Sequence, residues 1–307
     1  MNKVLYIILI SLFSLTVISC AKKSSTSSSS TTTDNTTTSG AVTTLAGTGS
    51  SGSANGTGTS ASFNGPAGIT TDGTNLYVAD YGNHLIRKIV ISTGVVTTLA
   101  GTGSSGSADN STGTSAGFNQ PYGITTDGTN LYVAEYGNHL IRKIVISTGV
   151  VTTLAGTGSS GSANGTGTSA SFYKPAGITT DGTNLYVADR YNYLIRKIVI
   201  STGVVTTVAG TGSSGAANGT GTSASFDKPY GVTTDGTNLY VGDYYNYLIR
   251  KIVISTGVVT TVAGTGLSGS ANGTGTSASF HLPRGITTDG TNLYVTEGGN
   301  HLIRKIE

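Results

Sequence analysis

Short runs of β-branched and aromatic residues alternate with runs of Gly, Ser, Thr and Asn along most of the chain. Residues 68–71, 76–79, 85–91 and 95–100 form four such runs in succession, separated by the segments DGTN, YGN and STG. Val, Ile, Thr and Tyr favour strands, whereas Gly, Asn, Asp and Ser favour turns. No segment of this part has sustained helical periodicity. The pattern therefore predicts four short strands joined by tight turns.

This unit is repeated. The string TTDGTNLYV occurs five times, and its aspartate recurs at spacings of 55, 54, 54 and 54 residues. All five prolines of the chain fall in phase with the repeat, and a phenylalanine stands three residues before each. Four strands per repeat with a period near fifty residues is typical of a propeller blade. The fold predicted is all-β, a single β-propeller of five four-stranded blades.

The two ends of the repeat region predict how the propeller closes. The last unit stops at Glu307, directly after its third strand, while residues 41–47 (AVTTLAG) match a fourth strand with no unit before it. We expect the N-terminal strand to pair with the last blade and complete a ring of twenty strands. Such closure removes an open sheet edge, which would otherwise invite aggregation.

Composition narrows the function classes. Charged residues make up 10% of the chain and the formal net charge is +3. The sequence therefore lacks the cluster of basic residues that would predict nucleic-acid binding. Cys20 is the only cysteine, which excludes an intrachain disulfide and a cysteine-based metal site. The glycine-rich strings are followed by neither GKS nor GKT, so they do not predict a nucleotide site. We expect no cofactor and no nucleic-acid partner.

The N-terminal segment has the features of a targeting signal. Residues 4–19 are an apolar run too short to span a membrane comfortably, and the run ends in Val-Ile-Ser before Cys20. This string resembles the lipobox of bacterial lipoproteins. The resemblance implies that residues 1–19 are a signal peptide, that Cys20 carries acyl chains such as palmitate, and that the protein is anchored in the bacterial cell envelope on the extracytoplasmic side. The alternative is an uncleaved membrane anchor.

The segment that follows predicts a tether. Residues 20–40 are rich in Ser and Thr and have almost nothing apolar to bury, so we expect a disordered linker between the lipidated cysteine and a folded domain at residues 41–307. In diderm bacteria the residue after the lipidated cysteine helps to sort lipoproteins. Ala21 is not the aspartate that favours inner-membrane retention in enteric species, which favours the outer membrane.

The repeat itself resembles a known family. The blocks PAGITTDGTNLYVADYGNHLIRKI and VTTLAGTG look like the NHL repeat, named for the residues found here as Asn83, His84 and Leu85. The resemblance covers residues 41–307 and implies a β-propeller. It does not imply one function, because members of the family include lyases, sensor domains and RNA- or protein-binding modules. Many members have six blades, and five is a departure from them.

Residues that recur in every blade predict structural roles. Each second strand ends in an acid, and an arginine follows seven residues later. We expect the acid to cap the turn and to pair with an arginine, because an arginine buried between sheets needs a carboxylate. Tyrosine replaces histidine at one repeat position in two blades, which favours packing or hydrogen bonding over zinc binding there. These sets are Asp80, Glu135, Asp189, Asp243 and Glu297 (acids), Arg87, Arg142, Arg196, Arg250 and Arg304 (arginines), and His84, His139, Tyr193, Tyr247 and His301.

The copies differ beside the prolines and between the second and third strands. In an up-and-down blade both places lie on the same face, so we expect them to surround one mouth of the central channel. Tyrosine and arginine are favoured at binding surfaces. The hypothesis is that this face binds a glycan, a peptide or an envelope protein, and the alternative is neutral drift in exposed loops. The candidate residues are Tyr122, Lys174, Arg190, Tyr191, Asp227, Lys228, Tyr230, Tyr244, Tyr245, His281 and Arg284.

The predicted function is a lipid-anchored binding or scaffold module of the cell envelope. The alternative is a propeller enzyme of the metal-dependent lyase or lactonase type with its site at the channel mouth. Near that mouth only Asp227 and His281 are singular, and one acid with one imidazole does not complete a metal site. A purely structural envelope protein is the third interpretation.

Overall fold

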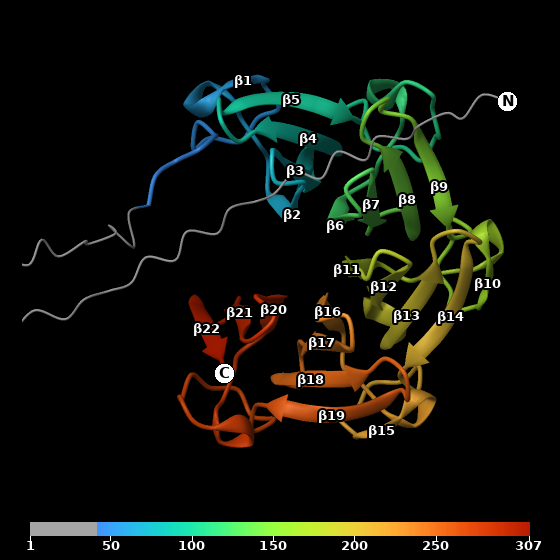
Figure 1. Cartoon of the computed structure of the whole chain (residues 1–307), viewed down its shortest axis with the longest axis vertical. Helices are drawn as coiled ribbons and strands as arrows, with labels where there is room; N and C mark the ends of the chain where they lie inside the picture. Colours follow the sequence, from blue (N-terminus) through green and yellow to red (C-terminus); the bar gives the residue numbers. More distant parts are fainter. Residues whose placement is uncertain (1–41) are drawn as a thin grey trace, which may run out of the picture. The chain divides into compact units, whose positions relative to one another are not determined.

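Five antiparallel sheets stand around a central axis in residues 43–307, which form one compact unit (Figure 1). The structure is a computed structural model that describes residues 42–307. The predicted signal peptide, Cys20 and the tether at residues 20–40 lie outside the described residues. Within the described range, no helix is long and apolar enough to cross a membrane.

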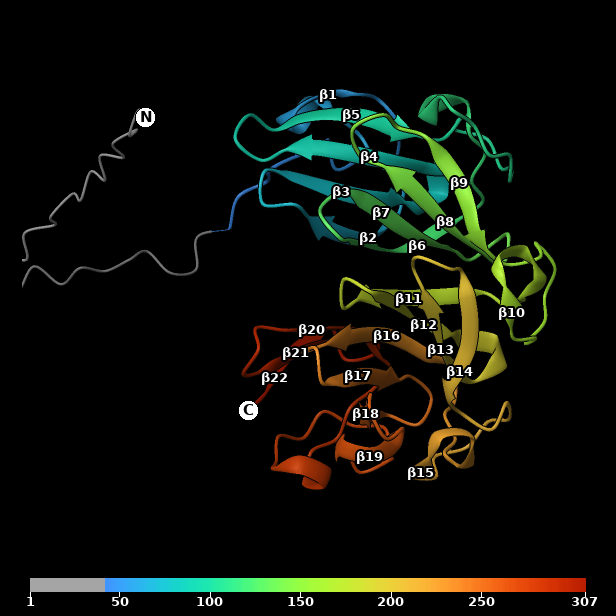
Figure 2. The same cartoon turned by 45° about the vertical axis from the view of Figure 1, so that its right-hand side comes forward.

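The first blade shows how each repeat folds. Its strands β2 (Pro66–Thr71), β3 (Asn75–Asp80), β4 (Leu85–Val90) and β5 (Val95–Ala100) form an antiparallel meander, as the sequence pattern predicts. An additional two-residue strand, β1 (Gly56–Thr57), pairs with the outer edge of β5. The sheet order is β1-β5-β4-β3-β2, with β2 nearest the channel (Figures 1 and 2).

The other blades repeat this order. Their strands are β6 (Pro121–Thr126), β7 (Asn130–Glu135), β8 (Leu140–Val145) and β9 (Val151–Ala155); β10 (Gly165–Thr166), β11 (Pro175–Thr180), β12 (Asn184–Asp189), β13 (Leu194–Val199) and β14 (Val204–Ala209); β15 (Gly219–Thr220), β16 (Pro229–Thr234), β17 (Asn238–Asp243), β18 (Leu248–Val253) and β19 (Val258–Ala263); and β20 (Pro283–Thr288), β21 (Leu293–Glu297) and β22 (Leu302–Ile306). One-turn 3-10 helices lie at Gly58–Ser60, Tyr81–Asn83, Gly113–Ser115, Gly167–Ser169, Arg190–Asn192, Gly221–Ser223 and Gly275–Ser277. The prediction of an all-β propeller with five blades is confirmed.

The core lies between blades. In the interface of the first two blades, Tyr77 and Ile86 pack with Phe118, Ile124 and Leu131, and all five are buried. Fully burying one such side chain contributes about 1.5–3 kcal/mol. Tyr77, Tyr132 and Tyr186 of the first three NLYV strings are therefore core residues, whereas Tyr240 and Tyr294 are only partly buried. In all five strings the tyrosine hydroxyl donates to the aspartate of the preceding turn.

Glycines set how closely the innermost strands approach each other. A Cβ at Gly68 would lie 2.4 Å from the carbonyl oxygen of Tyr122, and one at Gly123 would lie 2.2 Å from that of Ala176. Side chains at these positions would push neighbouring blades apart. The repeat places glycine at the same point in every blade, so each interface imposes a similar rotation on the next blade.

The predicted closure of the ring is wrong. The last sheet has only β20, β21 and β22, and residues 43–47 form no strand with it. Ala46 instead packs against the first blade. Ile69 and Ile303, on the two sides of this seam, are 61% and 72% exposed, whereas the equivalent Ile195 is fully buried. Because similar interfaces repeat the same rotation, four of them leave the fifth blade short of the first.

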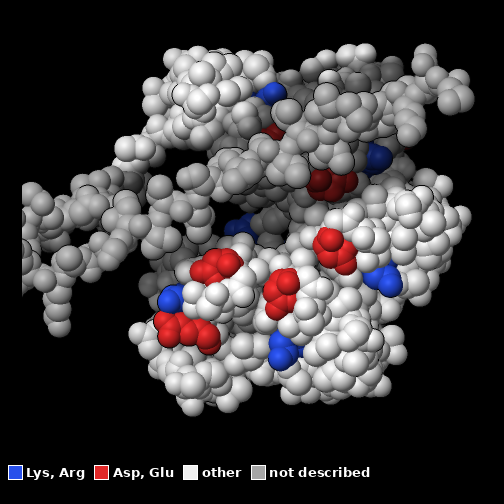
Figure 3. All heavy atoms as spheres, viewed as in Figure 1, with Lys and Arg blue, Asp and Glu red and all other residues white. Residues whose placement is uncertain are grey.

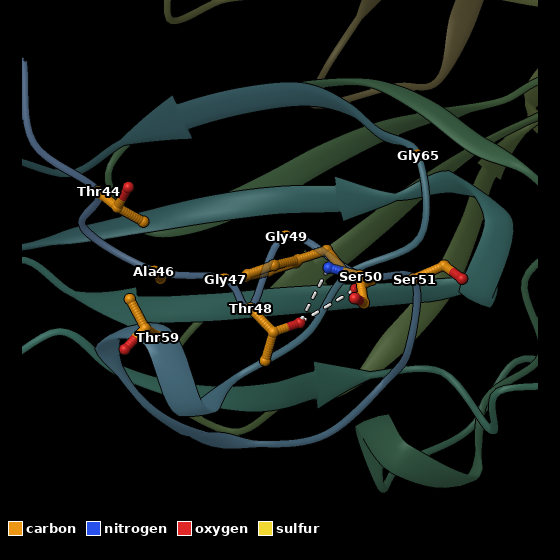
Figure 4. Close-up of a pocket in the computed structure, with 10 residues that line it drawn as sticks. Thr44, Ala46, Gly47, Thr48, Gly49, Ser50, Ser51, Thr59 and Gly65 are labelled. Atoms are coloured by element: carbon orange, nitrogen blue, oxygen red, sulfur yellow. Dashed lines mark hydrogen bonds between the residues drawn. The ribbon is translucent and has the colours of Figure 1, made fainter.

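The seam leaves a cavity of about 610 Å³ on the first blade (Figure 4). Two hydrogen bonds join Thr48 and Ser50 on its wall. The Thr48 hydroxyl donates to the Ser50 carbonyl, and the Ser50 N–H donates to Thr48 Oγ1. Phe63 also lines this cavity and is only half-buried, while Phe172 at the same repeat position is fully buried by the preceding blade. The cavity is the uncovered half of an interface between blades.

Candidate functional site

An arginine and a carboxylate are buried together inside every blade. In the third blade, Arg196 Nη1 lies 2.8 Å from Asp189 Oδ2, and both side chains are fully buried. The guanidinium also donates to the carbonyl of Ser171 and to Asn164 Oδ1, each at 3.0 Å, and stacks on Phe172 with 5.2 Å from Cζ to the ring centroid. The predicted structural pairing is confirmed, because the same pair forms in all five blades.

The carboxylate of this pair also holds the start of the blade. Asp189 accepts hydrogen bonds from the backbone N–H of Tyr173 and from Asn192 Nδ2, both at 2.8 Å. Burial raises the pKa of Asp189 to about 6, against the opposing effect of these hydrogen bonds and of the Arg196 charge. The pair has no free face toward the channel, so it serves the fold.

The repeated histidine joins neighbouring blades. His84 Nδ1 accepts the backbone N–H of Gln120, and His139 Nδ1 accepts that of Lys174, both at 3.0 Å. Burial and the nearby charge of Lys174 lower the pKa of His139, which keeps the ring a neutral acceptor. The predicted hydrogen-bonding role is confirmed for these two residues. Within residues 42–307 there is no group of three or more His, Cys, Asp and Glu that could hold a metal.

Tyrosines from four blades meet at one end of the channel. Tyr122 lies 5.8 Å from Tyr81, 6.1 Å from Tyr136 and 5.3 Å from Tyr230 between ring centroids. The hydroxyl of Tyr230 donates to that of Tyr122. Tyr244 continues the cluster at 5.2 Å from Tyr230. Edge-to-face contacts of this kind stabilise a fixed arrangement of aromatic rings.

Four cations lie on these rings. Arg190 Cζ is 4.5 Å and Arg284 Cζ is 5.2 Å from the centroid of Tyr230. Lys174 Nζ is 5.2 Å and Lys228 Nζ is 5.1 Å from the centroid of Tyr191. Arg190 also lies 5.2 Å from Tyr191, so the two groups adjoin. We call Tyr81, Tyr122, Tyr136, Tyr191, Tyr230, Tyr244, Tyr245, Lys174, Arg190, Lys228 and Arg284 the mouth cluster.

Both lysines of the mouth cluster have an unusual backbone conformation. Lys174 and Lys228, each directly before a proline, have φ of 53° and 50°, where the first blade has Gly65 at 58°. A left-handed conformation is uncommon for a lysine and costs on the order of 1 kcal/mol. The hydrogen bond from the Lys174 N–H to His139 helps to hold this conformation. Gln120 and Leu282 have the same conformation at this position in the other two blades, with φ of 54° and 57°, so it belongs to the repeat and is not peculiar to the lysines.

The mouth cluster borders a cavity of about 1060 Å³ that continues along the channel. Tyr122, Tyr230, Arg190 and Arg284 line one part of it, and the seam residue Ile303 lines another. Its size is in the range of ligand sites in proteins. The innermost strands supply most of the remaining wall.

The structure brings together nine of the eleven residues predicted to form the ligand face. They are Tyr122, Lys174, Arg190, Tyr191, Lys228, Tyr230, Tyr244, Tyr245 and Arg284. His281 instead packs edge-on against Tyr247, with 5.7 Å between ring centroids. Asp227 lies beside the cluster: its carbonyl accepts the N–H of Tyr245, and burial raises the pKa of its carboxyl against the opposing charge of Lys228. The prediction missed Tyr81 and Tyr136. Their position differs between blades, which was the available signal, but three copies share tyrosine there.

Comparisons with known proteins agree on the repeat. The NHL repeat family matches residues 63–89. The chain is 32% identical over 286 residues to Protein SUPPRESSOR OF QUENCHING 1, chloroplastic, of Arabidopsis thaliana, and 29% identical over 308 residues to NHL repeat-containing protein 2 of Homo sapiens. Each match covers 87% of this chain but only 27% and 42% of those proteins, so the chain spans less than half the length of these relatives.

Among solved structures, an auxiliary nutrient binding protein from Bacteroides ovatus superposes with a TM-score of 0.53 at 18% identity. The match covers 86% of this chain and 76% of that one. At this identity the likeness concerns the fold alone.

Proposed function

Because this chain belongs to the NHL-repeat β-propellers, we propose that it is a binding module of the bacterial cell envelope, held by a lipid on Cys20 and taking its ligand at the mouth cluster. The observation that carries the proposal is the gathering of four cations on several tyrosine rings, with two of these cations, Arg190 and Arg284, lining a cavity of about 1060 Å³. Concave sites lined by aromatic rings with a few charged groups are typical of ligand binding.

The binding proposal is tested by a screen of the full chain in non-ionic detergent against soluble glycans, peptides and envelope extracts. The test variant is Arg190→Met with Arg284→Met, since methionine keeps the apolar stem of the side chain. The control, Lys197→Met with Lys251→Met, removes equal charge from β13 and β18, outside the mouth cluster. We expect a ligand that binds the wild type and the control at least about tenfold more tightly than the test variant. Equal binding to all three would place the ligand elsewhere.

The anchor is tested separately. Metabolic labelling with palmitate should label the wild type and leave Cys20→Ser unlabelled, because the thiol is the attachment point in the lipobox interpretation. Equal labelling of both would contradict lipidation at this residue. Turnover of a bound ligand in the same screen would favour the enzyme alternative over a binding module.

A further inference from the structure

No carboxylate of residues 42–307 lies within 4.0 Å of the four cations of the mouth cluster, although the charge of Lys228 acts on the neighbouring Asp227. Among residues 42–307, ion pairs within 4.0 Å join the five blade arginines to acids, and Lys305 to Glu307. None of these pairs includes Lys174, Arg190, Lys228 or Arg284. Like charges gathered over two adjoining rings repel one another unless an anion joins them. The aromatic rings of the mouth cluster therefore pack on one another, but no anionic group balances its positive charge.

The tyrosine between the lysines responds to this charge. A hydrogen bond with Tyr136, together with the charges of Arg190, Lys228 and Lys174, lowers the pKa of Tyr191 below its ordinary value. A phenol pKa falls when positive charge favours the phenolate. The same field would favour an anionic ligand at this position.

The other end of the channel has the opposite charge. Each innermost strand leads from the mouth into a DGTN turn, so the five turn aspartates, Asp72, Asp127, Asp181, Asp235 and Asp289, lie together at the far end. The face shown in Figure 3 has acidic side chains in an arc around the channel, with Lys and Arg side chains beside and outside that arc. Hydrogen bonds from the backbone and side chain of Asn292 lower the pKa of Asp289, which keeps it ionised. An anion is thus repelled at the far end and attracted at the mouth.

The tyrosine rings of the mouth cluster indicate which class of anion it could bind. Tyr245, 42% exposed at the rim, packs edge-to-face on Tyr244 at 4.9 Å, and Lys228 Nζ lies 4.7 Å from its ring. Aromatic faces beside cations suit a ligand that presents flat C–H surfaces and negative groups together. The hydroxyls of Tyr122 and Tyr136 already accept hydrogen bonds from Arg284 and Arg190, so each offers its O–H as a donor to a ligand rich in hydroxyl groups. A sugar acid meets all three requirements, whereas an acidic peptide supplies charge without regularly spaced rings.

We propose that the mouth cluster binds an acidic saccharide, a short glycan of uronic acid units whose carboxylates pair with Arg190, Arg284, Lys174 and Lys228 while its rings lie on the tyrosines. This inference rests on the proposed function, since it names the ligand class for the same site. Arginine pairs with carboxylates through two parallel hydrogen bonds, which gives orientation as well as affinity. The cavity volume of about 1060 Å³ accommodates several sugar rings.

The test is calorimetric titration of the full chain in non-ionic detergent with three probes. They are an oligogalacturonate, its methyl ester, which has the same rings without charge, and an oligoglutamate of similar charge. We expect the oligogalacturonate to bind at least about tenfold more tightly than either other probe. Its affinity should fall several-fold as NaCl rises from about 50 mM to about 500 mM, because salt screens exposed charges. Arg190→Met with Arg284→Met should lose at least about tenfold, and Lys197→Met with Lys251→Met should not.

Each other result has a defined meaning. Equal affinity for the ester would overturn the acidic class while leaving a glycan-binding function intact. Equal or tighter binding of oligoglutamate would assign the mouth to acidic peptides and overturn the saccharide. Binding of none of the probes, with a ligand found in the wider screen, would overturn this inference but not the proposed function. A wider screen without any ligand at the mouth would overturn both.

Discussion

Two sets of arginines in this molecule are treated in opposite ways. Within the blades, Arg196 is fully buried, pairs with Asp189 and donates to two backbone carbonyls. At the mouth, Arg190, only six residues earlier in the chain, lies on tyrosine rings and donates to the hydroxyl of Tyr136 at 3.2 Å. The blade arginine thus has an internal counterion and the mouth arginine has none within 4.0 Å among the described residues.

The difference teaches how charge separates structural from functional positions in a repeat protein. A buried arginine is tolerated only with a carboxylate and full hydrogen bonding, so every blade must carry both partners. A half-buried arginine without a counterion is not required by the fold, and it occurs in one blade only. An arginine that recurs in every blade and pairs with an internal carboxylate has a structural role. An arginine that occurs in one blade and has no internal counterion indicates a binding site.

The largest effect should come from exchanging one member of each set. Arg196→Met leaves the Asp189 carboxylate buried without its partner, which should lower the free energy of unfolding by about 3–5 kcal/mol. Arg190→Met should change it by less than about 0.5–1 kcal/mol, because the apolar stem is kept and no carboxylate is stranded. Urea denaturation followed by far-UV circular dichroism measures both. A loss for Arg190→Met as large as that for Arg196→Met would break the comparison.

A smaller effect is expected where a blade arginine borders the seam. Arg304 pairs with Glu297 at 2.6 Å, but its side chain is 10% exposed and no further blade covers it. Because water partly solvates the pair, Arg304→Met should cost about 1–3 kcal/mol, clearly less than Arg196→Met. The same denaturation series checks this. Equal losses at both positions would show that residue 304 is as enclosed as residue 196.

A turn aspartate at the far end of the channel should contribute to stability in a pH-dependent way. Burial opposes ionisation of Asp235, but hydrogen bonds from Asn238 outweigh it and lower the pKa to about 2. A depressed pKa stabilises the fold above the unfolded pKa near 3.8, and this contribution is lost as pH falls toward 2. Asp235→Asn should therefore cost about 1 kcal/mol at pH 7, and the difference from wild type should vanish between about pH 4 and pH 2. A difference that stays constant down to pH 2 would contradict the assignment.

The smallest effect concerns the hydroxyl that links both sides of the mouth cluster. Tyr122 accepts hydrogen bonds from Arg284 Nε at 2.9 Å and from Tyr230. Since Arg284 is exposed, water can replace the lost acceptor, and Tyr122→Phe should cost less than about 1 kcal/mol. Thermal unfolding measures it. A larger cost would mean that the tyrosine network supports the fold and not only the site.

The repeat made most of the fold and the internal ion pairs predictable. Five copies of one strand pattern fix the number of blades, and an acid that recurs seven residues before an arginine in every copy fixes their pairing. Closure was not predictable in the same way. The strand sequence at residues 43–47 is present, but whether it reaches β22 depends on the rotation between blades summed over four interfaces, which no single repeat encodes.

The mouth was predictable from disagreement between the copies, but only in part. Arg190 stood out because it differs from all its repeat equivalents, whereas Tyr81 and Tyr136 were missed because they match each other and Tyr244. The left-handed backbone of Lys174 carries no sequence signal, since lysine rarely adopts it, and its contact with His139 joins two blades. Contacts across blades need the three-dimensional arrangement.

The most direct test of the central claim is the thermal unfolding midpoint of the wild type and of Arg190→Met with Arg284→Met, each with and without oligogalacturonate. Without ligand the two midpoints should agree within about 2–3 °C, because these arginines are not needed by the fold. At about 100 times the wild-type Kd the ligand should stabilise the wild type by about 2.7 kcal/mol, which raises its midpoint by several degrees, and should stabilise the variant by no more than about 1.4 kcal/mol, because the variant binds at least about tenfold more weakly. An equal rise in both, or a variant that melts far below the wild type without ligand, would contradict the account.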